Sequence, residues 1–150
     1  MAELITPEFV LLDLEAPDRA DATRQLATLL EQGGRVTDLD GFLADVTARE
    51  AQMPTGIEGG IGIPHARSKH VTEPSLAFGR SSAGVDYGSA DGPATLIFLI
   101  AAPEGGGGEH MQILASLARR LIHQSFKDSL RSAADAQEVV DIVNKEVLGR

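Results

Sequence analysis

Two histidines stand in settings where a side chain could meet an anion. His65 follows Pro64 at the end of a glycine-rich segment, residues 55–62, and His110 follows four consecutive glycines at the expected start of a helix. Backbone amides approach anions closely in glycine-rich segments and at helix N-termini. Because a neutral imidazole can attack phosphorus, His65 is a candidate nucleophile and His110 a candidate partner. On the residues alone, a buried structural His65 and a plain hydrophilic helix start at His110 remain open alternatives.

The other two histidines fit ordinary roles better. His70 lies in a polar stretch with Arg67 and Lys69, which predicts a solvated loop residue. His123 is expected in the last turn of a helix, where a surface imidazole suits the negative helix end. Neither histidine is therefore a candidate for the chemistry.

Several other chemistries lack the residues that they need. The chain has no cysteine, which excludes disulfides, thiolate catalysis and cysteine zinc sites. His65 and His70 lack the spacing of a helical zinc motif. The glycines at 105–108 are not followed by the Lys-Ser or Lys-Thr of a nucleotide-binding loop, and the G-x-S-x-G of a serine hydrolase does not occur. We therefore expect neither a metal nor a cofactor.

Composition limits the class of partner. The formal net charge of −9 argues against nucleic acid, whose phosphates recruit Lys and Arg, and allows a basic protein partner. The longest apolar stretch, Leu96 to Ala102, is too short to cross a bilayer, and no basic segment leads into an apolar one at the N-terminus. We expect one domain over residues 1–150, with no direct membrane insertion and a cytoplasmic location, whether alone or as a module of a larger assembly.

Helices are predicted by apolar residues that recur at helical spacing. Such spacing marks residues 19–32, which two glycines end, and residues 40–52. Asp135 stands three residues before Glu138 and resembles a capping box at the start of a last helix. Two further helices are expected, one from about Glu109 through Leu121 and one around 125–133.

Strands are predicted between these helices. The run Ala94 to Ala102 is continuously apolar, as is typical of a strand buried on both faces. Residues 76–80 alternate like a strand, residues 84–93 are rich in turn residues, and residues 4–14 indicate a strand pair or an extended segment. Strands interleaved with helices predict an α/β fold, a sandwich with helices on both sides of the sheet.

A set of motifs over nearly the whole chain resembles one family. The motifs are Leu4 to Pro7, Arg49-Glu50, residues 53–57, Gly60 to Arg67 with its Pro64-His65 pair, Asp91-Gly92, Ile97 to Pro103, and Glu109-His110 before Leu114-Ala115. Together they strongly resemble the enzyme IIA domain of the bacterial phosphoenolpyruvate-dependent sugar phosphotransferase system, fructose/mannitol class.

This resemblance implies a fold, a reaction and partners. It implies a three-layer α/β/α sandwich around a mixed sheet, in which His65 takes a phosphoryl group from the phosphocarrier protein HPr. The group then passes to an enzyme IIB domain, which serves sugar uptake through the membrane IIC domain. Arg49 and His110 would contact the phosphoryl oxygens or orient the imidazole, because an arginine offers a planar fork of donors. We expect the backbone of Gly60, Gly62 and Gly108 to line the phosphate pocket.

Two other functions remain as alternatives. Residues 84–88 and 64–67 look fructose-like, which favours fructose uptake over a regulatory enzyme IIA of the nitrogen-related branch. That branch would use the same phosphohistidine as a switch. The second alternative is a non-catalytic module that binds an anion in the same pocket.

Overall fold

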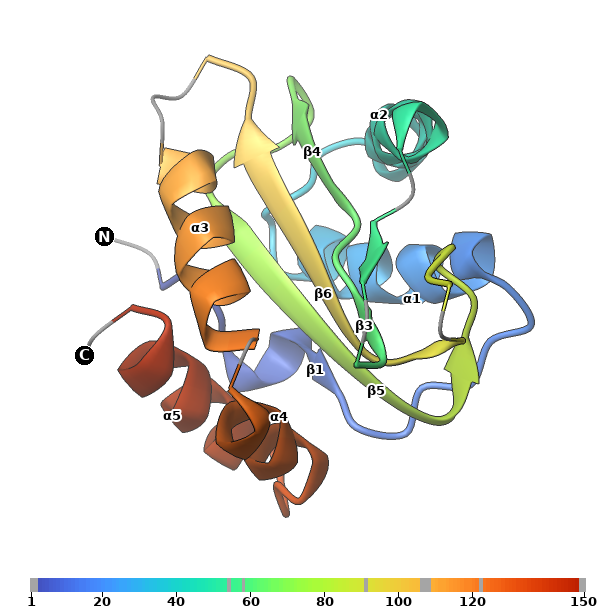
Figure 1. The fold of residues 1–150 in the computed structure, drawn as a ribbon. Coiled ribbons are helices and arrows are strands. Elements are labelled where there is room, and N and C mark those ends of the chain that lie inside the picture. The colour runs from blue at the N-terminus through green and yellow to red at the C-terminus, as the bar shows by residue number, and fades with distance from the viewer. Residues whose placement is uncertain are drawn as a thin grey trace.

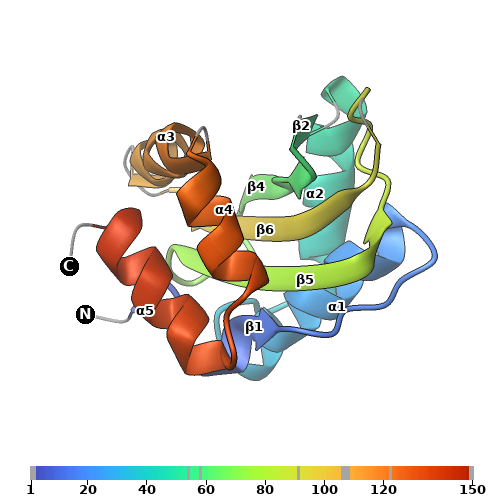
Figure 2. The ribbon, with the colours of Figure 1, turned by 60° about the horizontal axis from the view of Figure 1, so that its bottom comes forward.

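A mixed sheet lies between two layers of helices in the computed structural model of this chain. The structure describes residues 3–53, 55–57, 59–90, 92–105, 109–121 and 123–148. For residues 109–111 it describes the backbone only. Helices α1 and α2 cover one face, and α3, α4 and α5 lie on the other (Figures 1 and 2). The predicted three-layer α/β/α sandwich is therefore confirmed.

The first helix layer begins and ends where the sequence predicts. Helix α1 spans Arg19–Gln32, and the side chain of Asp18 accepts a hydrogen bond from a backbone N–H in its first turn. Helix α2 spans Leu39–Gln52 and is capped in the same way by Asp38. Such caps satisfy N–H groups that have no partner inside the helix. Helix α1 packs against strand β5, and α2 packs against β4.

The second layer contains α3 at Glu109–Leu121, α4 at Gln124–Arg131 and α5 at Ala136–Glu146. Asp135 caps α5 by accepting from the N–H of Glu138, as predicted. The prediction for His123 is half wrong. The residue is exposed, but it precedes α4 as its N-cap, because α3 ends at Leu121.

The sheet has six strands within the described residues, in the order β1-β5-β6-β3-β2, with β4 also paired to β6. The strands are β1 (Val10–Leu11), β2 (Gly56–Ile57), β3 (Ile61–Gly62), β4 (His65–Ser68), β5 (Ser75–Val85) and β6 (Ala94–Pro103). β6 runs parallel to β3 and β4 and antiparallel to β5, so the sheet is mixed. All residues of β6 from Leu96 to Ala102 are buried, which confirms the predicted two-sided burial.

Two predicted elements differ from the structure. Residues 4–14 hold no strand pair: Pro7–Phe9 form a single 3₁₀ turn (η1), and the short strand β1 follows and pairs with β5. The strand predicted at 76–80 continues to Val85, because β5 shifts register between Arg80 and Val85 and then rejoins β6. Part of the predicted turn-rich stretch is therefore strand.

Candidate functional site

His65 lies at a break in the strand that borders β6. β3 pairs with β6 opposite Leu96 and Ile97, and pairing resumes in β4, where His65 stands opposite Ile100. Pro64 lies in the break and has no N–H to donate, while its carbonyl accepts from the Ile100 N–H at 3.0 Å. The half-buried His65 is thus fixed on its backbone by the sheet, in the same register against β6 as β3.

The imidazole of His65 has a defined tautomer. Its Nδ1 lies 2.8 Å from the carbonyl oxygen of Ile63, within the break. A carbonyl oxygen only accepts hydrogen bonds, so Nδ1 carries the proton in the neutral ring. Nε2 is then the ring nitrogen with the lone pair. In the neutral ring, Nε2 is therefore the nitrogen that can act as a nucleophile.

Helix α2 runs past β4 in the opposite direction. Near its start, Gly41 lies against the ring of His70, and one turn later Asp45 Oδ2 accepts from the hydroxyl of Ser68 at 2.6 Å. Another turn advances the helix by about 6 Å, or about two strand residues. The side of α2 that carries Asp45 therefore brings Arg49 level with the start of β4, where His65 stands.

Arg49 is half-buried at the end of α2, where Nη1 donates to the carbonyl of Met53 at 3.2 Å. This contact satisfies one of the carbonyls that lack a partner inside the last turn of a helix. The remaining guanidinium donors give Arg49 the means to bind an oxyanion as well.

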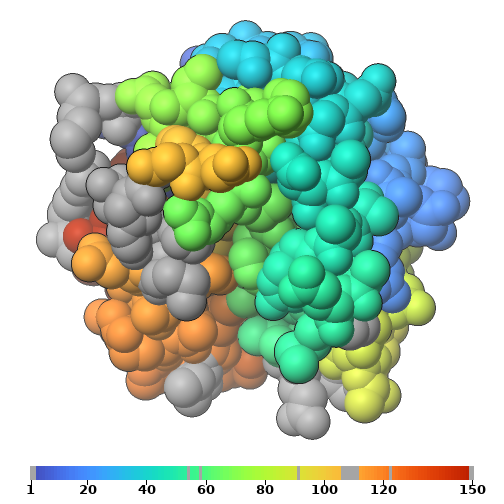
Figure 3. All heavy atoms as spheres, turned by 90° about the horizontal axis from the view of Figure 1, so that it is seen from above, coloured from blue at the N-terminus to red at the C-terminus, as the bar shows by residue number. Residues whose placement is uncertain are grey.

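The other predicted site residues have mixed outcomes. His110 is the second residue of α3, but its side chain is outside the description, and Gly108 lies outside the described residues altogether. Figure 3 looks onto the end of the molecule where β4, α2 and α3 meet, and green atoms of the β4 region lie in a recess between the teal of α2 and the orange of α3. The role of His110 stays a prediction.

The register separates one of the predicted pocket glycines from His65. The carbonyl of Gly60 accepts from Thr95 and Leu96 at the start of β6, four positions before the partner of His65, or about 13 Å along the strand. Gly60 also has a φ of 78°, which favours glycine. Its positive φ in the turn that leads into β3 thus explains why residue 60 is a glycine.

Gly62 has a packing reason. A Cβ built on Gly62 would lie 2.8 Å from the ring of Tyr87, so only glycine fits beneath that ring. The turn predicted at Asp91-Gly92 is described at Gly92, whose φ is 124°, while Asp91 lies outside the described residues.

His70 differs from the prediction of a solvated loop residue. It does lie in a turn, but its side chain is only 21% exposed, and Nδ1 is 3.9 Å from Asp38 Oδ2. The N–H of His70 also donates to the hydroxyl of the fully buried Ser68. His70 thus contacts both the start of α2 and the end of β4.

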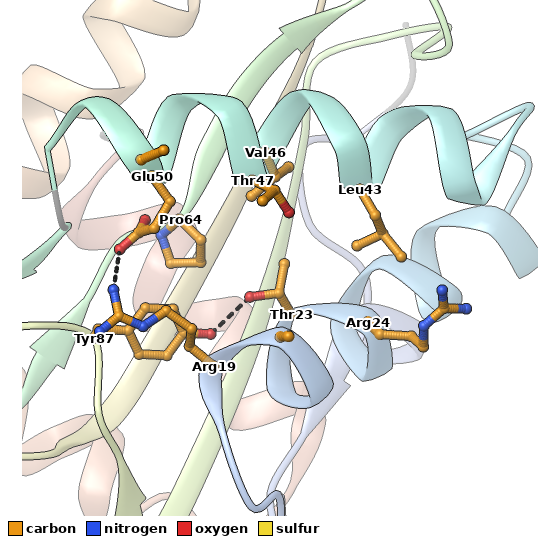
Figure 4. Close-up of a pocket in the computed structure, with 11 residues that line it drawn as sticks. Arg19, Thr23, Arg24, Leu43, Val46, Thr47, Glu50, Pro64 and Tyr87 are labelled. Carbon is orange, nitrogen blue, oxygen red and sulfur yellow. Dashed lines mark hydrogen bonds and ion pairs between the residues drawn. The ribbon is translucent and has the colours of Figure 1, made fainter.

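A cavity of about 470 Å³ lies between α1 and α2, beside the break that holds Pro64 (Figure 4). Four of its polar side chains form two pairs: Arg19 Nη1 lies 3.2 Å from Glu50 Oε2, and the Tyr87 hydroxyl lies 2.9 Å from that of Thr23. Burial raises the pKa of Tyr87 to about 12, against the lowering effect of the Thr23 hydrogen bond. Arg19, Glu50, Thr23 and Tyr87 therefore already satisfy one another in pairs.

Sequence reasoning missed two groups that shape the site, the carbonyl of Ile63 and the carboxylate of Glu50. Glu50 Oε2 accepts from the Thr55 N–H at 2.9 Å, and Oε1 accepts from the Thr55 hydroxyl at 2.7 Å. One signal was available. A negative charge in the last turn of a helix opposes the helix dipole, so an acidic residue there suggests a specific partner.

The described part of the chain contains neither a membrane-spanning helix nor a metal-binding cluster. Its helices include none that is long and apolar enough to cross a membrane. Its His, Asp and Glu side chains form no group of three or more that could hold a metal ion.

Comparison with known proteins gives consistent similarities. Residues 3–146 match the family model described as phosphoenolpyruvate-dependent sugar phosphotransferase system, EIIA 2. The chain is 40% identical to the fructose-specific EIIA component of Haloferax volcanii, covering 95% of this chain and 94% of that protein. It is 36% identical to the fructose-specific EIIABC component of Bacillus subtilis over 97% of its own length but only 23% of that protein. Its fold matches nitrogen regulatory protein IIA-Ntr from Neisseria meningitidis with a TM-score of 0.85 and 30% identity, covering 93% of this chain and 96% of that one.

Proposed function

Because the chain belongs to the EIIA 2 family of the phosphoenolpyruvate-dependent sugar phosphotransferase system, and is thus a phosphotransferase component that carries phosphoryl groups, we propose that Nε2 of His65 is its phosphoryl acceptor. The observation that carries this assignment is the 2.8 Å contact between His65 Nδ1 and the carbonyl of Ile63. It leaves the lone pair on Nε2 in the neutral ring.

The proposed step forms one bond and breaks one. Nε2 attacks phosphorus in line, and a P–N bond forms as the bond between phosphorus and the donor atom breaks. No proton leaves His65, because Nε2 has none and Nδ1 keeps its own against Ile63. The donor takes back its electron pair. Onward transfer reverses the roles, with His65 as the leaving group.

The charge on the transferred group is proposed to be met by Arg49 and His110. Phosphoryl transfer depends mainly on positioning and on stabilising charge spread over three oxygens. Arg49 reaches the level of His65 from α2 and offers a planar fork that a lysine does not. His110 and the N-terminal amides of α3 would add donors from the other side.

The proposed donor is HPr, and the proposed acceptor is a IIB domain that works with a membrane IIC domain. In support, the Bacillus relative is named as an EIIABC component, of which this chain spans 23%. Both that relative and the Haloferax relative are named as fructose-specific, so fructose is the proposed sugar. The proposal places the carrier in the cytoplasm, where phosphoenolpyruvate is made.

The test of the acceptor is phosphorylation of the wild type and of His65→Ala with phosphoenolpyruvate, enzyme I and HPr. Mass spectrometry should detect one acid-labile phosphoryl adduct on the wild type and none on the variant. An adduct on both proteins would move the acceptor to another histidine. No adduct on the wild type, with an HPr that phosphorylates a known acceptor, would favour the anion-binding alternative.

A regulatory role is the alternative, since the structural relative from Neisseria meningitidis is named a nitrogen regulatory protein. The two functions differ in where the phosphoryl group goes. With cognate IIB and IIC domains, a fructose transporter component should lose its phosphoryl group when fructose is added and keep it with other sugars. A phosphorylated protein that ignores every sugar would support the regulatory function.

A further inference from the structure

Glu50 follows Arg49 on α2 but lies in a different environment. Its side chain is only 11% exposed, and it faces the cavity between α1 and α2, where Figure 4 shows it pointing toward Arg19. A buried carboxylate is costly unless hydrogen bonds satisfy it. Here Arg19 Nη1 and both polar hydrogens of Thr55 do so. Both carboxylate oxygens of Glu50 are therefore hydrogen-bonded.

The hydrogen bonds between β2 and β3 indicate a role for Glu50. Gly56 and Gly62 are partners, so the next antiparallel pair along the chain is Thr55 and Ile63. Antiparallel pairs alternate between hydrogen-bonded pairs, which exchange two N–H···O bonds, and pairs without such bonds. Ile63 N–H donates to the Thr55 carbonyl at 3.3 Å, so Thr55 and Ile63 stand in a hydrogen-bonded position. Thr55 N–H turns to Glu50 Oε2 instead, and the Ile63 carbonyl receives the imidazole of His65.

Glu50 therefore takes the donor that would otherwise approach the Ile63 carbonyl. From this exchange we propose that Glu50 is a positioning residue, which reserves the Ile63 carbonyl for Nδ1 of His65 and so keeps the lone pair on Nε2. The inference rests on the proposed function of His65 as phosphoryl acceptor. Glu50 touches neither the phosphoryl group nor a partner protein in this proposal. It acts through Thr55 and Ile63.

Arg19 completes the arrangement from the other side. Its guanidinium lies 3.2 Å from Glu50 Oε2 and reaches Asp86 at 3.7 Å, so it links Glu50 to the chain just before Tyr87. The carboxylate is thus held between α1 and the start of β2. A carboxylate with fixed hydrogen-bond donors on both sides keeps its orientation when the imidazole becomes charged or phosphorylated.

The decisive variant is Glu50→Ala, measured in two ways. In the unphosphorylated protein, ¹⁵N NMR of the imidazoles should detect loss of the single His65 tautomer, because Thr55 N–H competes for the Ile63 carbonyl. In rapid single-turnover assays with phospho-HPr, the maximal acceptance rate should fall about 10-fold to 100-fold, the range expected for a misdirected reacting group. The concentration of phospho-HPr at half-maximal rate should stay within about twofold, because Glu50 lies away from the partner.

Asp40→Ala is the matched control. Asp40 is also a carboxylate of α2 paired with an arginine, Arg24, but its side chain is 85% exposed. The control should leave both the tautomer and the rate unchanged. Glu50→Gln should fall between the wild type and Glu50→Ala, since an amide oxygen still accepts one bond from Thr55.

The outcomes separate the two proposals. A folded Glu50→Ala protein with the wild-type tautomer and rate would overturn the role of Glu50. If that variant does not fold, Glu50→Gln decides, because it should lose part of the tautomer preference and part of the rate; a wild-type tautomer and rate in Glu50→Gln would overturn the role equally. Failure of the wild type to accept phosphoryl would sink the proposed function, while the tautomer measurement would still report on Glu50.

Discussion

The charged side chains on the two sides of helix α2 lie in different environments. On the side toward β4, Asp45 binds Ser68, and Arg49 follows one turn later, half-buried, with Nη1 donating to the carbonyl of Met53. On the side toward α1, Glu50 is nearly buried and satisfied by Arg19 and Thr55. Two adjacent residues thus lie in different environments. In our proposals, Arg49 binds the incoming anion, and Glu50 positions the backbone around His65.

This contrast predicts how substitutions on each side will behave. A change at Arg49 should alter transfer and largely spare stability, because this side chain is only half-buried. A change on the Glu50 side, which includes Tyr87 and Gly62, should alter stability or positioning, because those groups are buried and close-packed.

Arg49→Ala should have the largest effect on rate. Loss of a charged donor should slow phosphoryl acceptance by about 10²-fold to 10³-fold, by analogy with loss of an oxyanion donor. The urea midpoint should hardly move. Arg49→Lys should recover only part of the rate, because an ammonium lacks the planar fork. Acceptance at the wild-type rate in the alanine variant would remove Arg49 from the mechanism. It would also contradict the proposed difference between Arg49 and Glu50.

Raising the pH should destabilise the Glu50 side through Tyr87. Burial raises the pKa of Tyr87 to about 12, so the unfolded chain ionises near pH 10 while the folded chain does not. The contribution of Tyr87 is complete below pH 10 and is lost as the pH rises toward 12, which lowers the free energy of unfolding by about 2–3 kcal/mol.

Urea unfolding at a series of pH values measures this loss, with Tyr87→Phe as the control that lacks it. Tyr87 is the only tyrosine in the sequence, so its ionisation can be followed by absorbance without overlap. A tyrosine that titrates near pH 10 in the folded protein would contradict the buried placement.

Gly62→Ala should destabilise the fold by about 1–3 kcal/mol, as overpacking in a core does. The new Cβ would lie 2.8 Å from the Tyr87 ring. Gly105→Ala is the control, since a Cβ there meets nothing within 4 Å, and its free energy of unfolding should change by less than about 0.5 kcal/mol. Equal stability of the two variants would mean that the ring does not cover Gly62.

Much of the fold follows from local patterns, whereas the setting of His65 does not. Helix α1 has the predicted bounds of 19–32, because a cap and two glycines mark its ends. β6 was predicted from its apolar run alone. β2, β3 and β4 are two to four residues long and exist through pairing with distant strands, so no periodicity indicates them.

Gly60 and Gly62 show the same limit of prediction from sequence. In the sequence, Gly60 and Gly62 stand where a phosphate pocket would need them, yet a turn and the Tyr87 ring account for them in the structure. His65 itself was selected from Pro64 and its family motif. The bond from its ring to Ile63 depends on where the strand breaks, which only the three-dimensional pairing determines.

The most direct test of the account is to locate the phosphoryl group on the phosphorylated protein by ¹⁵N–³¹P coupling, after labelling its histidines with ¹⁵N. The account predicts a single phosphohistidine at His65, with phosphorus on Nε2 and the proton still on Nδ1. Phosphorus on Nδ1 of His65, or on any other histidine, would contradict it.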